Sequence, residues 1–333
     1  MKIAVTGSTG FIGTNFLQEI VKDDKNEYIC LVRKESSRDK IPQSDNIVVK
    51  EITFNAEGLK EAFGGMDVVI NMVGQMGGHN VSEEDFKKAN CVLTQDIIDA
   101  CISNEVKQLI HLSTPGVQGF GHRLCEETVP YAPRNLYEET KVDAEQRIIE
   151  SLKNTEVHYT IIRPDYVYGP GDLRRVKMYK SIRDKKFVLT TSGKSYVHPT
   201  HVKDVVQGII VSIDNSNAYD EIFNISAEND IMVKDYLNII AGFFNVKVVQ
   251  INIGYGLSVF CAGILAFLFK LIKKEPFVNK NRIDFLAIDH STSIQKAKKL
   301  LNYKPEYDFK KGFENTMEWY YENNIIEKEG GNI

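Results

Sequence analysis

Cysteine is scarce in this sequence of 333 residues, and the few cysteines lie far apart. The five are Cys30, Cys91, Cys101, Cys125 and Cys261, and no CxxC pair is present. An odd number of separated cysteines argues against a disulfide framework and against a cysteine-ligated zinc site. Because the pattern is typical of a reducing compartment, we expect a cytoplasmic location.

The sequence also lacks an excess of charge of either sign. Its formal net charge is −4, and acidic and basic residues are interspersed without a basic stripe. This distribution argues against a nucleic-acid partner. No internal repeat is evident, and the chain opens on a strand pattern rather than on the basic and apolar regions of a signal peptide.

One long stretch, residues 251–269, contains no charged residue. Its length lies at the lower limit for a membrane span. Leu257, Phe260, Ile264 and Phe267 recur in it at helical spacing. Length and periodicity favour a buried helix or a lid helix, and contact of residues 251–272 with a membrane surface is the alternative.

Short apolar runs alternate with amphipathic segments through the first two thirds of the chain. The runs are KIAVTG, YICLVR, IVVKEI, DVVINMVG, KQLIHLST, HYTIIRP and EIFNIS. This alternation predicts an α/β fold with a doubly wound parallel sheet of Rossmann type and a smaller, helix-rich substrate lobe. We expect residues 1–170 and about 196–227 to form the nucleotide domain, and about 171–195 with 228–333 to form the lobe.

The segment VTGSTGFIG, residues 5–13, follows the first predicted strand and opens a helix. Its glycines, Gly7, Gly10 and Gly13, let the backbone turn tightly and approach a ligand closely. Unpaired N–H groups at the start of the helix suit a pyrophosphate. In this context the glycines predict a dinucleotide site rather than a plain turn.

The end of the second strand indicates which dinucleotide is bound. NAD sites place an acidic residue there, on the ribose hydroxyls. Here Val32 occupies that place and Arg33 follows. An arginine can grip a 2′-phosphate by charge-assisted hydrogen bonds, so NADP(H) is favoured over NAD(H).

Tyr137 and Lys141 are four residues apart, which places both on one face of a helix. A nearby ammonium can lower the pKa of a tyrosine enough for general acid/base catalysis. Ser113 and Thr114 end the preceding strand, where active-site residues of open α/β sheets collect. We therefore expect these four residues to form a catalytic group.

TGSTGFIG together with YEETK resembles the extended short-chain dehydrogenase/reductases of the NAD-dependent epimerase/dehydratase family. Five later segments also resemble landmarks of that family. They are NMVG, KANCVLTQDIIDAC, IIRPDYVYGPGD, HVKDVVQGI and residues 293–324. The resemblance implies that Tyr137 is the acid/base, that Lys141 lowers its pKa and binds the nicotinamide ribose, and that Thr114 is the catalytic hydroxyl beside Ser113. The implied cofactor contacts are Gly7, Thr9, Gly10, Phe11, Ile12, Gly13, Arg33, Val73, Gly74, Asn90, Tyr137, Lys141 and Pro164.

The sequence departs from the sugar-nucleotide members of this family at several places. Tyr166 stands where they usually have asparagine, Val197 and His198 stand near a common phosphate-binding arginine, and Gln118 replaces an aromatic residue. Two substrates stay open: the frequency of sugar substrates in the family favours a nucleoside-diphosphate sugar, and an apolar ketone, as in hydroxysteroid dehydrogenases and dihydroflavonol reductases, is the alternative. A non-catalytic dinucleotide-binding regulator or assembly factor is the rival from another class, and a homodimer is left open. We expect no metal, although His198 and His201 are closely spaced.

Overall fold

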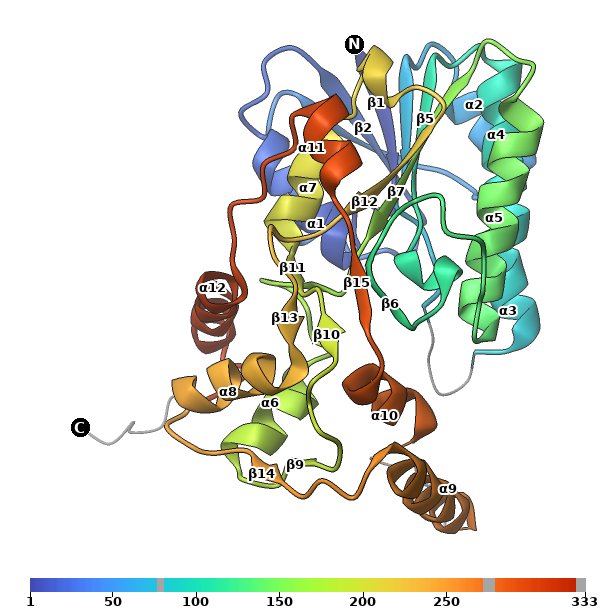
Figure 1. Cartoon of the computed structure of the whole chain (residues 1–333). Coiled ribbons are helices and arrows are strands. Elements are labelled where there is room, and N and C mark those ends of the chain that lie inside the picture. The colour runs from blue at the N-terminus through green and yellow to red at the C-terminus, as the bar shows by residue number, and fades with distance from the viewer. Residues whose placement is uncertain (77–80, 272–278, 328–333) are drawn as a thin grey trace.

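A computed structural model describes residues 1–76, 81–271 and 279–327. Its centre is a seven-stranded sheet of order β12-β7-β5-β4-β1-β2-β3, in which every pair is parallel (Figure 1). These strands are β1 (Lys2–Thr6), β2 (Glu27–Val32), β3 (Ile47–Glu51), β4 (Val68–Asn71), β5 (Gln108–Leu112), β7 (His158–Pro164) and β12 (Glu221–Ile225). The seven apolar runs of the sequence and the predicted parallel sheet are thus confirmed.

Helices cover both faces of this sheet because its strands are apolar on both sides. On one face lie α1 (Phe11–Ile20), α7 (Val202–Ile210) and α11 (Gln295–Leu301), whose apolar residues share a core with β1 and β12. On the other lie α2 (Ala56–Ala62), α4 (Leu93–Ser103) and α5 (Leu136–Leu152). α11 falls within residues 228–333, which the sequence assigned to the smaller lobe, yet its Ala297 and Leu301 pack in the sheet core.

A third core lies below the carboxyl edge of the sheet in Figure 1. It is built mainly from α6 (Val176–Arg183), α8 (Val233–Phe243) and α12 (Phe309–Glu322). A four-stranded sheet of order β13-β10-β15-β6 joins this region to the rest, with strands Ile231–Met232, Tyr196–Val197, His290–Thr292 and His122–Cys125. β8 (Val167–Tyr168) pairs with β11 (Thr200–His201), and β9 (Val188–Leu189) pairs with β14 (Val249–Gln250). The short helix α3 (Glu83–Lys87) runs into a π-helical turn at Lys88–Val92, and 3-10 helices lie at Pro115–Gln118 and Ser216–Ala218.

The apolar stretch forms the helix α9 (Tyr255–Leu271), which packs on α10 (Lys280–Ala287). The expectation of a buried helix is wrong, because α9 leaves Phe260 65% exposed and Phe267 63% exposed. The other face of α9 is covered at Ser258 and Ala262. Among the described residues, no helix combines the length and apolarity needed to cross a bilayer.

A buried ion pair fixes α5 against β7. Arg163 donates Nε to Glu145 Oε1 at 2.9 Å and Nη2 to Glu145 Oε2 at 2.5 Å, and both side chains are almost fully buried. Tyr131 adds a third hydrogen bond, from its hydroxyl to Glu145 at 2.9 Å. Since Glu145 lies one turn after Lys141, this pair holds the helix that carries the predicted catalytic residues.

Glu145→Ala should therefore lower the free energy of unfolding by about 3–5 kcal/mol, because it leaves the buried Arg163 charge without a partner. Urea denaturation followed by circular dichroism measures this change. The matched control is Glu83→Ala, which removes an exposed pair with Lys87 and should leave the midpoint unchanged. Equal midpoints for the two variants would contradict the assigned role of the buried pair.

Candidate active site

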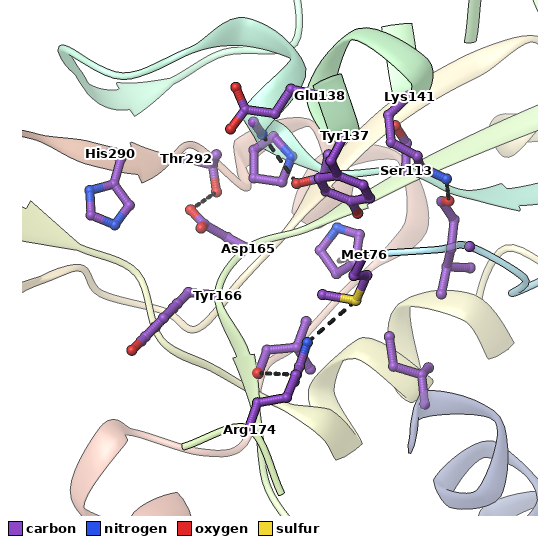
Figure 2. Close-up of a pocket in the computed structure, with 18 of the residues that line it drawn as sticks. Met76, Ser113, Tyr137, Glu138, Lys141, Asp165, Tyr166, Arg174, His290 and Thr292 are labelled. Carbon is purple, nitrogen blue, oxygen red and sulfur yellow. Dashed lines mark hydrogen bonds between the residues drawn. The ribbon is translucent and has the colours of Figure 1, made fainter. Parts of the chain in front are cut away.

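A cavity of about 460 Å³ opens at the carboxyl edge of the large sheet, where the smaller lobe meets it. Figure 2 shows side chains from both regions pointing into it. Of the residues predicted from the sequence, the cavity is lined by Gly7, Gly10, Phe11, Ile12, Gly13, Val73, Gly74, Ser113, Thr114, Tyr137, Lys141 and Pro164. Thr9, Arg33 and Asn90 do not line it.

The glycine loop between β1 and α1 leaves no space for side chains. Gly7 has a φ of +74°, and a Cβ added there would lie 2.7 Å from the Met72 carbonyl carbon. A Cβ on Gly13 would lie 2.2 Å from the Gly7 carbonyl oxygen. No side chain caps the start of α1, so its first N–H groups face the cavity edge without a side-chain acceptor. This cradle fits a dinucleotide diphosphate.

Asn90 lies behind the cavity wall, and its hydrogen bonds hold part of that wall in place. The Asn90 amide donates to the Gln75 carbonyl at 3.0 Å and to Thr140 Oγ1 at 2.9 Å, and it accepts from the Gln75 N–H at 2.8 Å. These bonds join the loop after β4 to α5. Arg33 is exposed just beyond β2, and its guanidinium forms no ion pair within the part of the chain that the structure describes.

Tyr137 and Lys141 both face the cavity from the first turns of α5. Asn135 caps this helix by accepting a hydrogen bond from the Glu138 N–H at 3.0 Å. Lys141 is buried, and its ammonium nitrogen lies 2.5 Å from the Leu112 carbonyl oxygen and 3.1 Å from His111 Nε2. The lysine thus joins α5 to β5.

The predicted lowering of the Tyr137 pKa by Lys141 is not found among the protein groups that the structure describes. Burial raises the pKa of Tyr137 to about 12, and the nearby cation that opposes this rise is Arg174 rather than Lys141. The reason is geometric, since the Lys141 nitrogen is engaged by β5. Tyr137 is therefore a protonated phenol at neutral pH.

The two hydroxyls at the end of β5 differ in their surroundings. Thr114 Oγ1 accepts a hydrogen bond from the Gly116 N–H at 3.2 Å and thereby caps the short helix 115–118. Ser113 is 6% exposed, and its Oγ has no partner among the described residues. A buried hydroxyl without a partner at the cavity wall points to a bound group that completes its hydrogen bonding.

Four stacked or tilted rings, which we call the aromatic wall, line the cavity on the side of the smaller lobe: Phe120, Tyr166, Phe285 and His290. Phe120 stacks on His290 at 4.2 Å between ring centres, and Phe285 lies 4.4 Å from Tyr166 and 4.5 Å from His290. Burial lowers the pKa of His290 to about 4, so this ring is neutral. Tyr166 has a φ of +32°, which is unusual for a residue with a large side chain.

The arginines of the cavity are already paired with acids. Arg174 Nε and Arg175 Nη1 donate to Asp172 at 2.7 and 2.6 Å, and Arg134 Nη2 donates to Glu138 at 2.6 Å. Figure 2 also shows Arg174 reaching the Met76 sulfur, at 3.4 Å. The sequence analysis missed these residues, although Arg174 and Arg175, which follow YGPGD after Leu173, were a usable signal.

Asp165 is a second residue that the sequence analysis missed. It lines the cavity, is 4% exposed, and accepts a hydrogen bond from Thr292 Oγ1 at 3.1 Å (Figure 2). Burial raises the pKa of its carboxyl to about 8. Asp165 is therefore a largely neutral acid at neutral pH.

His198 and His201 take part in packing. His198 Nδ1 lies 3.1 Å from the Thr292 carbonyl oxygen, and His201 stacks on Tyr307 at 3.9 Å. Over residues 1–76, 81–271 and 279–327, no group of three or more histidine, cysteine or acidic residues has the arrangement of a metal site. Residues 77–80, in the stretch GQMGGHN that follows β4, lie outside the described residues.

A family model described as the NAD dependent epimerase/dehydratase family matches residues 3–226. The chain belongs to this family. It is accordingly an NAD(P)-dependent oxidoreductase or epimerase of the extended short-chain dehydrogenase/reductase type, and the resemblance drawn from the sequence is confirmed.

Relatives of this epimerase/dehydratase family protein differ widely in substrate. Sterol-4-alpha-carboxylate 3-dehydrogenase (decarboxylating) of Candida albicans is 24% identical, over 96% of this chain and 97% of its own length. N-acetyl-alpha-D-glucosaminyl-diphospho-ditrans,octacis-undecaprenol 4-epimerase of Escherichia coli is 24% identical, over 84% of both chains. The structure of UDP-glucuronic acid 4-epimerase from Bacillus cereus in complex with NAD has the same fold, with a TM-score of 0.77 and 19% identity over 97% of this chain and 99% of that one.

Proposed function

We propose that this protein transfers a hydride between a nicotinamide cofactor and a secondary alcohol or ketone carbon, with Tyr137 as the general acid/base. The observation that carries this proposal is that Tyr137, Lys141 and the glycine loop line one cavity. When bound, the cofactor supplies or accepts the hydride. The glycine loop would hold its diphosphate, with Val73, Gly74 and Pro164 beside it.

The residues around the reacting oxygen fit reduction of a ketone. Tyr137 carries its proton at neutral pH, so it can give that proton to the oxygen as the carbon receives the hydride. Ser113 has a free hydroxyl with which to hydrogen-bond the same oxygen, and we favour it over Thr114, whose oxygen already caps a helix. In the reverse direction the phenolate of Tyr137 would take the proton of an alcohol.

For the substrate we infer a flat, largely apolar ketone or alcohol rather than a nucleoside-diphosphate sugar. The aromatic wall offers ring faces for stacking, and it carries no charge because His290 is neutral. A diphosphate needs cations, and Arg134, Arg174 and Arg175 are each paired with a carboxylate. The name of one relative mentions a sterol, which agrees with an apolar substrate, whereas another names a glucosaminyl diphosphate linked to undecaprenol.

For the cofactor we propose NADP(H) over NAD(H). Arg33 lies just beyond β2, where the adenine ribose of a dinucleotide sits in this class of fold. Its exposed guanidinium has no carboxylate partner among the described residues and is free for a 2′-phosphate. Arg38, by contrast, is paired with Glu51 at 2.5 Å.

We further propose that α9 lies on a lipid surface. Its outer face exposes Leu257, Phe260, Ile264, Phe267 and Leu268, each by about half or more. An apolar face of this kind on a surface helix is typical of interfacial binding. α9 packs on α10, which carries Phe285 of the aromatic wall, so a lipid surface under α9 would be adjacent to the substrate end of the cavity.

Tyr137→Phe should reduce turnover of a ketone substrate by about 10²–10⁴-fold while cofactor affinity stays within twofold, because it removes only the transferable proton. Turnover is followed at the nicotinamide absorbance band with a panel of cyclic apolar ketones, and by product analysis with a panel of UDP- and dTDP-sugars, because an epimerase returns the hydride and gives no net absorbance change. Activity with the sugars alone would contradict the inferred substrate. Equal turnover in wild type and variant would remove Tyr137 from the mechanism, and no turnover on either panel would favour a non-catalytic dinucleotide-binding protein.

Arg33→Ala should weaken NADPH binding roughly 10- to 150-fold and leave NADH binding unchanged, since it removes one charge-assisted contact worth about 1.5–3 kcal/mol. Calorimetric titration of each cofactor gives the two affinities. Arg38→Ala is the control and should alter neither, because Glu51 already occupies that guanidinium. Tighter binding of NADH than of NADPH by the wild type would refute the assignment.

Phe260→Ser combined with Phe267→Ser should abolish sedimentation with vesicles of phosphatidylcholine and phosphatidylserine, to which the wild type binds. Ile102→Ser, at an exposed position on α4, is the control and should bind as the wild type does. Wild-type protein that stays in the supernatant at every lipid concentration would overturn the proposal. A dimer in the absence of lipid that the double variant abolishes would assign α9 to self-association instead.

A further inference from the structure

We propose that His111 is a positioning residue for Lys141: it presents a protonated ring nitrogen to the lysine and so favours the neutral amine in the cofactor-free protein. Lys141 is then a group that exchanges a proton near neutral pH rather than a fixed positive charge. The catalytic consequence rests on the proposed function, whereas the hydrogen-bond arrangement itself does not.

The argument begins at Asn71, at the end of β4. Its Oδ1 accepts hydrogen bonds from Thr6 Oγ1 at 2.8 Å and from the Val73 N–H at 3.1 Å. A backbone N–H can only donate, so the Val73 bond fixes which end of the Asn71 amide carries the oxygen. The Asn71 nitrogen must therefore face the other way, and it lies 3.0 Å from His111 Nδ1.

This orientation selects the tautomer of His111. The Asn71 Nδ2 group only donates, so His111 Nδ1 must accept and carries no proton. In a neutral imidazole the proton then sits on Nε2, which lies 3.1 Å from the Lys141 nitrogen. An ammonium has no lone pair to accept this hydrogen, whereas a neutral amine does. The neutral amine accepts from His111 and donates to the Leu112 carbonyl, which satisfies every group in the chain.

His111 has no means of avoiding this conflict by taking a second proton. Its ring is 1% exposed, and burial followed by the neighbouring Lys141 holds its pKa well below the usual value. The opposite tautomer would place an Nδ1 hydrogen against the Asn71 amide hydrogens. Turning that amide would in turn place its hydrogens against the Val73 N–H. A charge on Lys141 therefore costs at least one hydrogen bond in the series that links Asn71, His111, Lys141 and the Leu112 carbonyl.

Two other groups around Lys141 raise its pKa and so oppose the effects of burial and of His111. Burial lowers its pKa to about 8, while Glu145 on α5 and Cys91 in the turn before α4 raise it. Glu145 is occupied by Arg163 and Tyr131. Burial and Asp143 raise the pKa of Cys91 to about 12, so its thiol is neutral. On the cavity side Tyr137 is neutral as well, which leaves no free negative charge to hold an ammonium at this site.

The protonation of Lys141 would thus follow the charge of Tyr137. Above the Lys141 midpoint, once the phenol has given its proton away, the phenolate one turn before Lys141 favours an ammonium, and Lys141 takes up a proton from the solvent. Loss of the ammonium accompanies reprotonation of the phenol. Lys141 is then an ammonium when Tyr137 is a phenolate and a neutral amine when Tyr137 is a phenol. It therefore stabilises the reacting state more than the resting state.

The first experiment uses the wild-type protein without cofactor. In ¹⁵N spectra of histidine-labelled protein, His111 should carry its proton on Nε2, with His111→Phe identifying the signal. In lysine-labelled protein, Lys141 should titrate with a midpoint near 8, well below the value of about 10.4 for an ordinary lysine. A proton on Nδ1, or an ammonium that persists above about pH 10, would overturn the proposal even if no variant folds.

The second experiment changes the tautomer. Asn71→Asp presents a carboxylate oxygen to Nδ1, so the His111 proton should move to Nδ1 and the Lys141 midpoint should rise by about one pH unit or more, the equivalent of one hydrogen bond. His111→Gln should raise the Lys141 midpoint as well, because the new side chain can turn its oxygen to the ammonium. Asn217→Asp, the same substitution at an exposed position, should change neither reading. An unchanged Lys141 midpoint in both His111→Gln and Asn71→Asp would refute the role of His111.

Activity separates this inference from the proposed function. If the tautomer and the titration are as expected but no ketone is reduced, the proposed function fails and the hydrogen-bond arrangement stands. If ketone reduction is observed while Lys141 stays charged, the inference fails alone. In an active enzyme the high-pH limb of kcat/KM for ketone reduction should move upward in His111→Gln together with the Lys141 midpoint, a shift that a purely structural role would not produce.

Discussion

The hydrogen bond from Lys141 to the Leu112 carbonyl is the constraint on which the site depends. It ties the first turns of α5 to the end of β5, so Tyr137 on the helix and Ser113 just beyond the strand have fixed positions. The Arg163–Glu145 pair reinforces the same contact one turn later, against β7. Helix and sheet edge are therefore a single rigid unit at the place where the chemistry is proposed.

Much of this arrangement could be read from the sequence, because strands buried on both faces leave continuous apolar runs and the glycine loop has a fixed place after the first of them. Tyr137 and Lys141 share a cavity because their spacing puts them on one helical face. The sign of the Tyr137 pKa change could not be read in this way, since it depends on where a flexible lysine side chain finds its acceptor. Leu112 offers a carbonyl that no sequence pattern reveals.

The residues missed from the sequence come from segments without a regular pattern. Asp165, Arg174 and Phe285 reach the cavity from a strand end, a loop and a short helix that are more than a hundred residues apart at the extremes. Only tertiary packing brings them together. The exposure of α9 was likewise hidden, because an apolar helix that packs inside a core and one that packs on a lipid surface have the same composition.

Tyr166 illustrates how such a pocket specialises. At φ +32° the backbone adopts a conformation that asparagine or glycine accepts readily and that disfavours a bulky residue by about 1–3 kcal/mol. The ring is held there by a stack with Arg175 at 3.9 Å and by contact with Phe285. A residue chosen for foldability alone would not be tyrosine at this position. Replacing Tyr166 by asparagine or glycine would relieve this backbone cost and remove a ring from the wall in one step, so local stability and ligand preference are coupled at this position.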